Sequence, residues 1–351
     1  ANITYHEQTD IDNIRKLREV LKTLPAFAKD YFRAIEPTTS TKTRISYAYD
    51  IRIFFQFLIS QNPSLAKIGI PNLNVSVLDQ LKPIDIEEYM EYLKLYDSPN
   101  DQTTITNGER GLKRKISSLR SFYTYYYKRQ AIETNPVQLV DMPKIHDKAI
   151  IRLDAGETAA LLDYIEHCGD QLTGQRKAYY EKTKLRDLAI VTLLLGTGIR
   201  VSECVGLDVE DIDFRNNGIR LIRKGGSEMV VYFGPEVEKA LKDYLESRKA
   251  ISPLEGHEHA LFYSTQRKRI GVQAVENLVK KYSKLITTMK NITPHKLRST
   301  YGTSLYRETG DIYLVADVLG HKDVNTTKKH YAALEDERRR TAPKYIHLRD
   351  E

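Results

Sequence analysis

The segment Asn135–Pro143 constrains the fold most strongly, because it divides the chain into two parts. It reads Asn-Pro-Val-Gln-Leu-Val-Asp-Met-Pro, with a proline near each end and little hydrophobic periodicity. Proline has no backbone N–H and restricts the residue before it, so such a segment interrupts regular structure. A chain of 351 residues is long enough for two domains. We therefore expect a first domain at 1–134, an extended linker at 135–150 and a second domain at 151–333.

The first part has the hydrophobic periodicity of amphipathic helices. Ser40 or Thr41 is placed to cap a long helix, another helix opens at Pro83, and a further one runs from about Gly108 to Arg129. Helices of this kind joined by short loops are typical of a small bundle. Tyrosine and phenylalanine cluster near the end of the last helix, where we expect them to fill the core rather than to stack on bases.

The second part mixes helices with one hairpin. Residues Gly218–Arg223 alternate between apolar and polar side chains, which predicts a strand. Two glycines then form a turn, and Glu228–Phe233 form the returning strand of a hairpin. Helices are expected near 235–249, 272–288, 294–308, 311–319 and 325–333. The predicted fold class is therefore mainly α with a small antiparallel β-sheet.

The composition limits the kinds of binding partner and the cellular compartment that we expect for this chain. Lysine and arginine number 54 against 47 acidic residues, a net charge of +7 that suits an anionic partner such as nucleic acid. The two cysteines, Cys168 and Cys204, are too few for a disulfide framework, which favours the reducing cytoplasm. No apolar run approaches membrane-spanning length, so we expect no membrane partner.

Six reactive residues lie on short motifs in the second part. They are Arg200 in Gly-Thr-Gly-Ile-Arg-Val-Ser-Glu, Lys224 in Arg-Lys-Gly-Gly-Ser, His295 and Arg298 in Thr-Pro-His-Lys-Leu-Arg, His321 in Leu-Gly-His-Lys, and Tyr331 after Thr-Thr-Lys-Lys-His. Each motif alone has an ordinary explanation, such as a surface ion pair, a helix cap or an exposed turn.

Together these residue types suit a phosphodiester. Arginine presents a planar fork of N–H donors that fits two phosphate oxygens, and Glu203 can hold the Arg200 guanidinium in that pose. Pro294 at a helix start puts His295 and Arg298 on a first turn, where free backbone N–H groups also favour phosphate. A tyrosine can serve as a nucleophile, and a lysine on a hairpin tip can protonate a leaving oxygen.

In this order, across residues 196–331, the six residues resemble the tyrosine site-specific recombinases, and most closely the single-protein Xer type. The step from His321 to Tyr331 is one residue longer than in typical Xer relatives and equals that of mobile-element integrases. The resemblance implies an N-terminal helical core-binding domain that binds DNA and a C-terminal catalytic domain. It implies an enzyme that cleaves and rejoins DNA strands through a 3′-phosphotyrosine intermediate.

The resemblance also assigns a role to each reactive residue. The implied roles are nucleophile for Tyr331, phosphate clamp for Arg200 and Arg298, general acid/base for His295, phosphate hydrogen bond for His321, and proton donor to the 5′-oxygen for Lys224. Neither a metal nor another cofactor is implied, because the phosphotyrosine conserves the energy for rejoining.

The implied partner is double-stranded DNA with a specific, palindromic site, bound by a homotetramer on two such sites. Candidate phosphate contacts on the last helix of the first domain are Arg110, Lys113, Arg114 and Lys115, with a merely solvated helix face as the alternative. Residues 334–351 are a candidate segment for docking on a neighbouring protomer. An accessory protein or a DNA translocase is a further candidate partner.

The main functional prediction is Xer-like chromosome-dimer resolution, which serves chromosome partition at cell division. Integration and excision of a mobile element is the first alternative. A relaxing topoisomerase or a hairpin-forming resolvase would share the chemistry. A DNA-binding protein with an idle catalytic domain belongs to a different class, and it is disfavoured because all six reactive residues are present.

Overall fold

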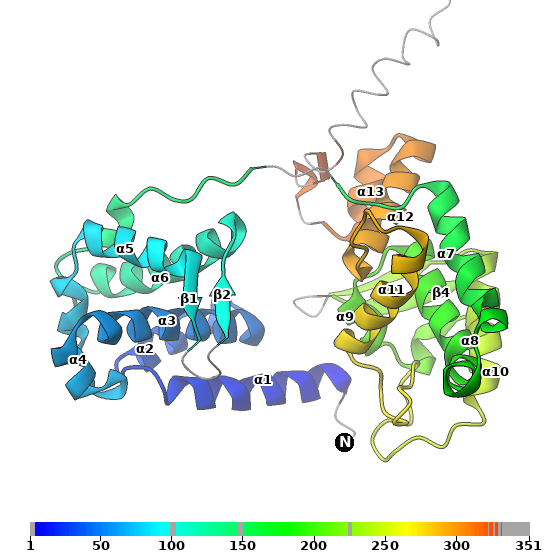
Figure 1. Cartoon of the computed structure of the whole chain (residues 1–351), viewed down its shortest axis with the longest axis horizontal. Coiled ribbons are helices and arrows are strands. Elements are labelled where there is room, and N and C mark those ends of the chain that lie inside the picture. The colour runs from blue at the N-terminus through cyan, green and yellow to red at the C-terminus, as the bar shows by residue number, and fades with distance from the viewer. Residues whose placement is uncertain are drawn as a thin grey trace, which may run out of the picture. The chain divides into compact units, whose positions relative to one another are not determined.

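The computed structural model describes residues 4–98, 103–146, 150–223, 227–321, 323–325, 327, 328 and 331. The chain divides into two compact units, Ala1–Lys148 and Ala149–Glu351. Each unit is mainly helical and carries a small antiparallel sheet (Figure 1). The predicted fold class is thereby confirmed. Across the described ranges, no helix combines the length and the apolar character needed to cross a bilayer.

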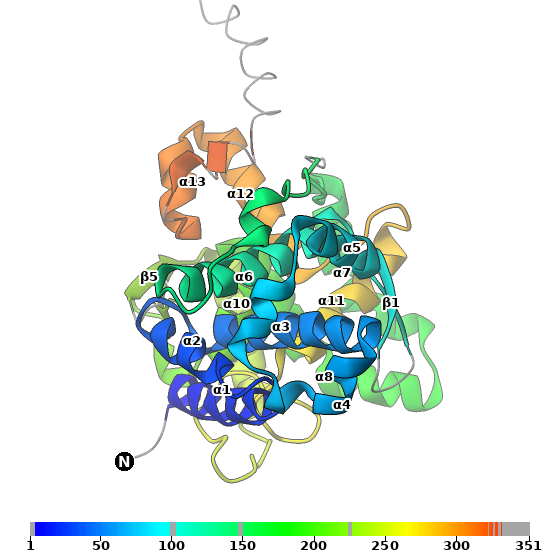
Figure 2. The ribbon, with the colours of Figure 1, turned by 90° about the vertical axis from the view of Figure 1, so that its left-hand side faces the viewer.

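The first unit is a helical bundle with a short hairpin. Its elements are α1 (Tyr5–Leu21), α2 (Ala28–Ala34), η1 (Glu36–Thr38), α3 (Thr41–Gln61), α4 (Pro63–Ile68), η2 (Ile70–Asn72), η3 (Val75–Gln80), α5 (Pro83–Lys94), β1 (Leu95–Asp97), β2 (Thr104–Thr106), α6 (Glu109–Lys128) and η4 (Pro136–Leu139). Helix α3 lies between α1 and α6 and contacts both (Figures 1 and 2). Phe122, Tyr123 and Tyr126 are buried whereas Tyr127 is 45% exposed, so most of the aromatic cluster packs in the core as predicted.

The helices of the first unit begin where the sequence predicted. The Ser40 hydroxyl accepts a hydrogen bond from the Thr43 backbone N–H at 3.2 Å and so caps α3. Pro83 occupies the first turn of α5, where its missing N–H costs nothing. These two local rules therefore hold in the folded chain.

The start of the predicted linker packs against the first unit. Val137 and Val140 are buried in the core of the bundle, on and just after the turn η4. Arg120 Nη2 donates to the carbonyl oxygens of both valines, at 3.1 and 2.9 Å. The expectation of an extended segment beginning at Asn135 is therefore wrong for its first residues. Their apolar side chains are instead buried against the core of the bundle.

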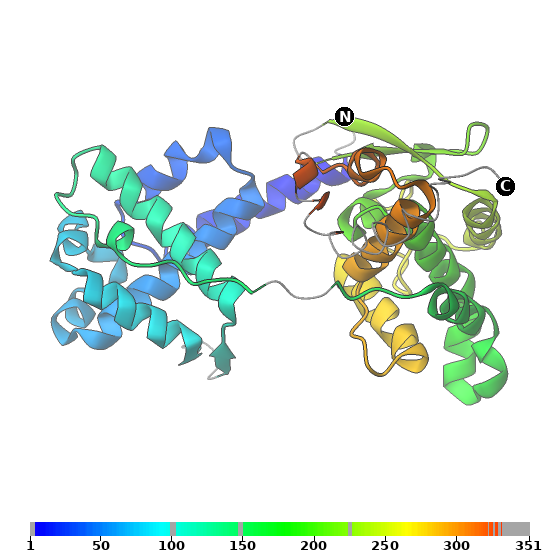
Figure 3. The same cartoon turned by 90° about the horizontal axis from the view of Figure 1, so that it is seen from above.

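The second unit is built around one long helix. Its elements are α7 (Ala155–His167), η5 (Cys168–Gln171), α8 (Gly174–Thr197), α9 (Val201–Gly206), η6 (Val209–Asp211), β3 (Ile212–Asp213), β4 (Gly218–Ile222), β5 (Glu228–Tyr232), α10 (Pro235–Arg248), α11 (Val272–Ile286), α12 (Pro294–Thr309) and α13 (Ile312–Leu319). Helix α8 contacts α7, α10 and α12 (Figure 3). The sheet has the order β3-β4-β5 and is antiparallel, which confirms the predicted hairpin.

Two glycine turns decide where α8 and α13 stop. Gly198 ends α8 and Gly320 ends α13, with φ of +64° and +61°. Glycine adopts this left-handed conformation without the steric cost that a Cβ brings. Arg200 follows the first turn and His321 follows the second, so both helices end where candidate site residues begin.

Candidate active site

Arg298 joins the two glycine turns. It lies in the first turns of α12, and only 5% of its surface is exposed. Its Nη1 donates to the carbonyl oxygen of Gly198 at 2.6 Å, and its Nη2 donates to the carbonyl oxygen of Leu319. Because these carbonyls lie two residues before Arg200 and His321, one guanidinium fixes the backbone in front of both.

Glu203 holds Arg200 at two points. One carboxylate oxygen accepts a hydrogen bond from Arg200 Nη1 at 2.8 Å, and the other accepts one from the Arg200 backbone N–H at 2.7 Å. The Glu203 side chain is 6% exposed, whereas the Arg200 side chain is 41% exposed. The guanidinium therefore reaches toward the surface from a buried anchor, which is the arrangement that the sequence predicted for this pair.

Tyr331 lies inside the second unit. It is 1% exposed and packs in an apolar cluster with Val315 and Leu319, its ring centroid 5.8 Å from that of Tyr306. Its hydroxyl rests against Gly302 of α12, where an added Cβ would come within 2.1 Å of the oxygen. Glycine at position 302 therefore makes room for the phenol.

Burial and charge oppose one another at the tyrosine. Burial raises the pKa of Tyr331 to about 12, although the positive charges of Arg298 and Arg152 lower it. Burial lowers the pKa of Arg298 to about 10, and neighbouring arginines lower it further, while Glu203 raises it. At neutral pH the phenol is protonated and the guanidinium is charged, so the site attracts anions.

The two candidate histidines lie in different surroundings. His321 follows the turn whose carbonyl Arg298 holds, and its Nδ1 is 2.7 Å from the hydroxyl oxygen of the buried Thr327. His295 lies on the first turn of α12 and is exposed. The structure thus places His321 on the loop that Arg298 organises, and His295 at the exposed start of the helix that carries Arg298.

Lys224 lies outside the described residues, but its neighbour Arg223 belongs to the site. The Arg223 side chain is 9% exposed, its Nε is 3.9 Å from Glu203 Oε1, and its Nη2 donates to the carbonyl oxygen of Val318 at 2.9 Å. The sequence analysis missed Arg223, because a basic residue beside a hairpin turn is ordinarily solvated and no spacing rule marks it.

The four candidate DNA contacts on α6 separate into two kinds. Arg110 is exposed and Lys113 is half-buried. Arg114 forms an ion pair with the buried Asp50 at 2.5 Å, and the buried Lys115 donates to a side-chain amide at 3.0 Å. Lys115 therefore serves the interior of the bundle, and we set it aside as a DNA contact.

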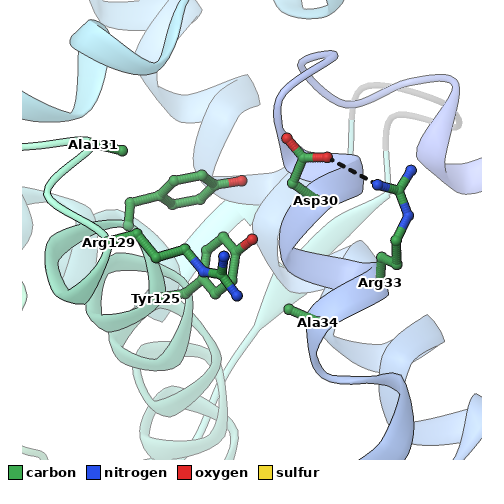
Figure 4. A pocket seen from close by; sticks show the side chains of 7 residues that line it. Asp30, Arg33, Ala34, Tyr125, Arg129 and Ala131 are labelled. Carbon is green, nitrogen blue, oxygen red and sulfur yellow. Dashed lines mark hydrogen bonds and ion pairs between the residues drawn. The ribbon is translucent and has the colours of Figure 1, made fainter.

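A hollow of about 410 Å³ lies beside α2 and the end of α6 (Figure 4). It is lined by Asp30, Arg33, Ala34, Tyr125, Tyr126, Arg129 and Ala131. The Arg129 guanidinium lies 4.6 Å from the centre of the Tyr125 ring, and Asp30 pairs with Arg33 at 3.4 Å. None of the candidate site residues lines this hollow, and its charged groups are engaged within it, Asp30 with Arg33 and Arg129 with the Tyr125 ring, so we assign it no chemistry.

The arrangement in the second unit is typical of phosphoryl transfer to a tyrosine. Arg200 and Arg298 supply charge and forked N–H donors, and the Tyr331 hydroxyl lies within the electrostatic reach of Arg298. In the part of the chain that the structure describes, no three His, Cys, Asp or Glu residues are grouped as metal ligands would be.

Comparison with known proteins then identifies the family. The profile of the phage integrase family matches residues 152–338. The chain is 33% identical to the protein named tyrosine recombinase XerC from Caldanaerobacter subterraneus subsp. tengcongensis, over 92% of this chain and 87% of that protein. It is 30% identical to tyrosine recombinase XerS from Streptococcus equi subsp. zooepidemicus, over 94% and 98%. The chain belongs to the phage integrase family and is a tyrosine recombinase of the Xer-like kind.

Solved structures share the fold. One is the XerH site-specific recombinase bound to a palindromic difH substrate in a post-cleavage complex, with a TM-score of 0.64, 16% identity, and coverage of 98% of this chain and 91% of that chain. Another is the Tn1549 transposon integrase in complex with transposon right end DNA, with a TM-score of 0.61, 22% identity, and coverage of 88% and 97%. The predictions of a recombinase enzyme and of Xer-like site-specific recombination are confirmed at the level of the family.

Replacing Glu203 by glutamine should destabilise the second unit by about 3 kcal/mol, because the buried carboxylate that pairs with Arg200 and with the buried Arg223 is lost. Denaturant unfolding at neutral pH measures the loss. The exposed pair of Glu210 with His259 is the matched control, and Glu210→Gln should cost less than about 1 kcal/mol. Equal small losses in both variants would contradict the anchoring role of Glu203.

Gly302→Ala should destabilise the protein, although alanine ordinarily stabilises a helix interior by about 1 kcal/mol relative to glycine. The new methyl group meets the Tyr331 hydroxyl. Since Tyr331→Phe removes that oxygen, the loss caused by Gly302→Ala should shrink in the Tyr331→Phe background. Four unfolding curves complete the cycle, and an identical loss in both backgrounds would refute this packing.

Proposed function

We propose that the chain exchanges DNA strands at a specific site and that Tyr331 is its nucleophile. The arrangement of Arg298 carries the proposal, because its buried guanidinium is bonded to the turns before Arg200 and His321 and acts electrostatically on Tyr331. Double-stranded DNA is the proposed substrate, and the XerH and Tn1549 integrase structures, which share the fold, are complexes with DNA.

The phosphate is held by the cationic residues. The Tyr331 oxygen attacks the scissile phosphorus, the bond to the 5′-oxygen breaks, and a 3′-phosphotyrosine forms. Arg200 and Arg298 hold the non-bridging oxygens and stabilise the pentacoordinate state. Two of the five N–H donors of Arg298 are bonded to backbone carbonyls, which aligns the guanidinium before the phosphate arrives. His321 donates a further hydrogen bond to the phosphate.

Two proton transfers accompany the cleavage. Burial keeps Tyr331 protonated at neutral pH, with a pKa of about 12, so attack requires a proton acceptor. His295 is the proposed acceptor. Lys224 is the proposed donor to the departing 5′-oxygen, and both transfers reverse when the strand is rejoined. Neither step consumes ATP, because the phosphotyrosine conserves the energy of the broken bond.

We propose chromosome-dimer resolution as the biological role. The relatives named XerC and XerS align with nearly the whole chain, which supports this choice. The proposed assembly is a cytoplasmic homotetramer on two palindromic sites, with residues 334–351, outside the described residues, docking on a neighbouring protomer. An accessory protein or a DNA translocase is a further proposed partner. Mobile-element integration is the second candidate, favoured by the spacing from His321 to Tyr331.

The wild-type protein should form a denaturation-resistant adduct with a nicked suicide duplex taken from its genomic neighbourhood, and Tyr331→Phe should form none. Peptide mass spectrometry of the adduct should locate the nucleotide on Tyr331. Tyr313 of α13 is 64% exposed, so Tyr313→Phe is the matched control and should still react. An adduct with Tyr331→Phe would contradict the nucleophile. A duplex that is bound but never cleaved would favour a DNA-binding protein with an idle catalytic domain.

Arg110 is the first candidate for a phosphate contact from α6, because it is exposed and no described acidic side chain pairs with it. Arg110→Ala should weaken DNA binding about equally for all sequences and reduce the slope of log affinity against log salt by about 1. Fluorescence anisotropy at several salt concentrations measures that slope. Arg33 on α2 is 77% exposed and serves as the control. An unchanged slope would remove Arg110 from the DNA interface.

A further inference from the structure

Arg223 is buried at the junction of three segments. It directly follows β4, and its backbone N–H donates to the carbonyl oxygen of Ser227 at 2.8 Å, which closes the hairpin. Its Nη2 donates to the carbonyl oxygen of Val318 at 2.9 Å, in the last turn of α13, and its Nε is 3.9 Å from Glu203 Oε1. The terminal carbonyls of a helix lack intrahelical partners and favour a cation. The contact with α13 therefore gains both a hydrogen bond and a favourable interaction of the positive charge with the helix dipole.

The guanidinium also fills the space above Gly320. A Cβ added at this position would lie 1.1 Å from Arg223 Nη1, and the φ of Gly320 is +61°. Position 320 therefore needs glycine both for its backbone conformation and for the arginine that lies on it. Because His321 is the next residue, Arg223 packs against the turn from which His321 projects.

Stability alone does not account for this placement. Among the described residues, the buried Nε and Nη1 of Arg223 have no hydrogen-bond partner. Burial lowers the pKa of Arg223, Glu203 raises it, and the like charge of Arg200 lowers it. A buried guanidinium with unsatisfied donors costs free energy, and an apolar side chain of similar size would avoid that cost. The residue is thus placed where it costs stability and where it contacts the hairpin, the end of α13 and Glu203.

We propose that Arg223 is a positioning residue for strand cleavage. Through its backbone it belongs to the hairpin that carries Lys224, and through its guanidinium it holds the end of α13 in front of His321. It also shares the Glu203 carboxylate with Arg200. It therefore keeps Arg200 and His321 in register, and this inference rests on the phosphate-binding roles proposed for them above.

Arg223 complements Arg298 rather than repeating it. The two guanidiniums bond the consecutive carbonyls of Val318 and Leu319, one from the hairpin and the other from α12. The end of α13 is thus held from two elements that are distant in sequence. Loss of Arg298 would remove a phosphate clamp, whereas loss of Arg223 would loosen only the alignment of the groups around the phosphate.

Single-turnover cleavage of the suicide duplex at saturating protein, together with DNA affinity over a range of salt, tests the proposal. Arg223→Ala should slow cleavage by roughly 10- to 100-fold, since small misplacements of reacting groups have effects of this size. DNA affinity and its salt slope should stay unchanged. Arg220 lies on the same hairpin, is 55% exposed and pairs with Asp211, so Arg220→Ala is the matched control and should cleave at the wild-type rate.

Three outcomes would overturn the proposal. The first is Arg223→Ala cleaving at the wild-type rate. The second is a loss of affinity with a shallower salt slope, which would make Arg223 a phosphate contact. The third is a lower reaction amplitude with an unchanged rate constant, which would show only a loss of folded protein. If the wild type itself forms no adduct on DNA that it binds, the proposed function fails instead.

Gly320→Ala gives an independent test that does not require Arg223→Ala to fold. The added methyl group would displace the guanidinium, so Gly320→Ala should reproduce the slow cleavage. Gly174 has a φ of +57° but open space around its Cβ position, so Gly174→Ala imposes similar backbone strain and should cleave normally. In the Arg223→Ala background, Gly320→Ala should have much less effect than in the wild type. Additive effects of the two substitutions would refute the coupling.

Discussion

The hydrogen bonds of Arg298 to two backbone carbonyls are the interaction on which the site depends. A buried guanidinium must be matched by acceptors, and here the acceptors are the carbonyl oxygens of Gly198 and Leu319, at the ends of α8 and α13. Both ends are glycine turns, which leave their last carbonyls unpaired within the helix. The buried charge is matched by these carbonyls, and the carbonyls gain donors, so the two hydrogen bonds hold the segments before Arg200 and His321 together.

Burial also sets the chemical state of Tyr331, the proposed nucleophile. Tyr331 is packed against Gly302 and among apolar side chains, which raises the pKa of its phenol to about 12 despite nearby arginines. The apolar surroundings keep the phenol hydroxyl protonated, and a protonated hydroxyl is a weak nucleophile. In the proposed mechanism, reactivity therefore depends on groups that gather around the phenol together with the phosphate. Such a design would restrain cleavage until a DNA strand is in place.

Short-range sequence rules predicted much of this structure. The features that they did not predict depend on contacts between segments that are distant in the sequence. The cap at Ser40, the start of α5 at Pro83 and the β4–β5 hairpin follow from short-range preferences of the chain, so the sequence reveals them. The burial of Val137 depends on a core formed by distant helices. Arg223 likewise looks like a solvated hairpin residue, and only the approach of α13 turns it into an interior one. The motif residues were found by their joint order, whereas the contacts among them required the tertiary structure.

The balance of charge around Glu203 explains how the buried arginines can serve the site despite the free energy that their burial costs. Glu203 lies beside Arg200 and Arg223 and also acts on Arg298, so one carboxylate is shared among three guanidiniums. The shared carboxylate is enough to hold the arginines in place but not enough to neutralise them. Burial lowers the pKa of both Arg223 and Arg298, and repulsion from neighbouring guanidiniums lowers it further, so the folded protein carries a cost of holding these charges together. An incoming phosphate would relieve that repulsion, and it would do so most where negative charge increases during attack. Because backbone carbonyls already fix Arg298 and Arg223, and Glu203 already fixes Arg200, little reorganisation would be needed at that moment. The relief of the repulsion would then stabilise the transition state.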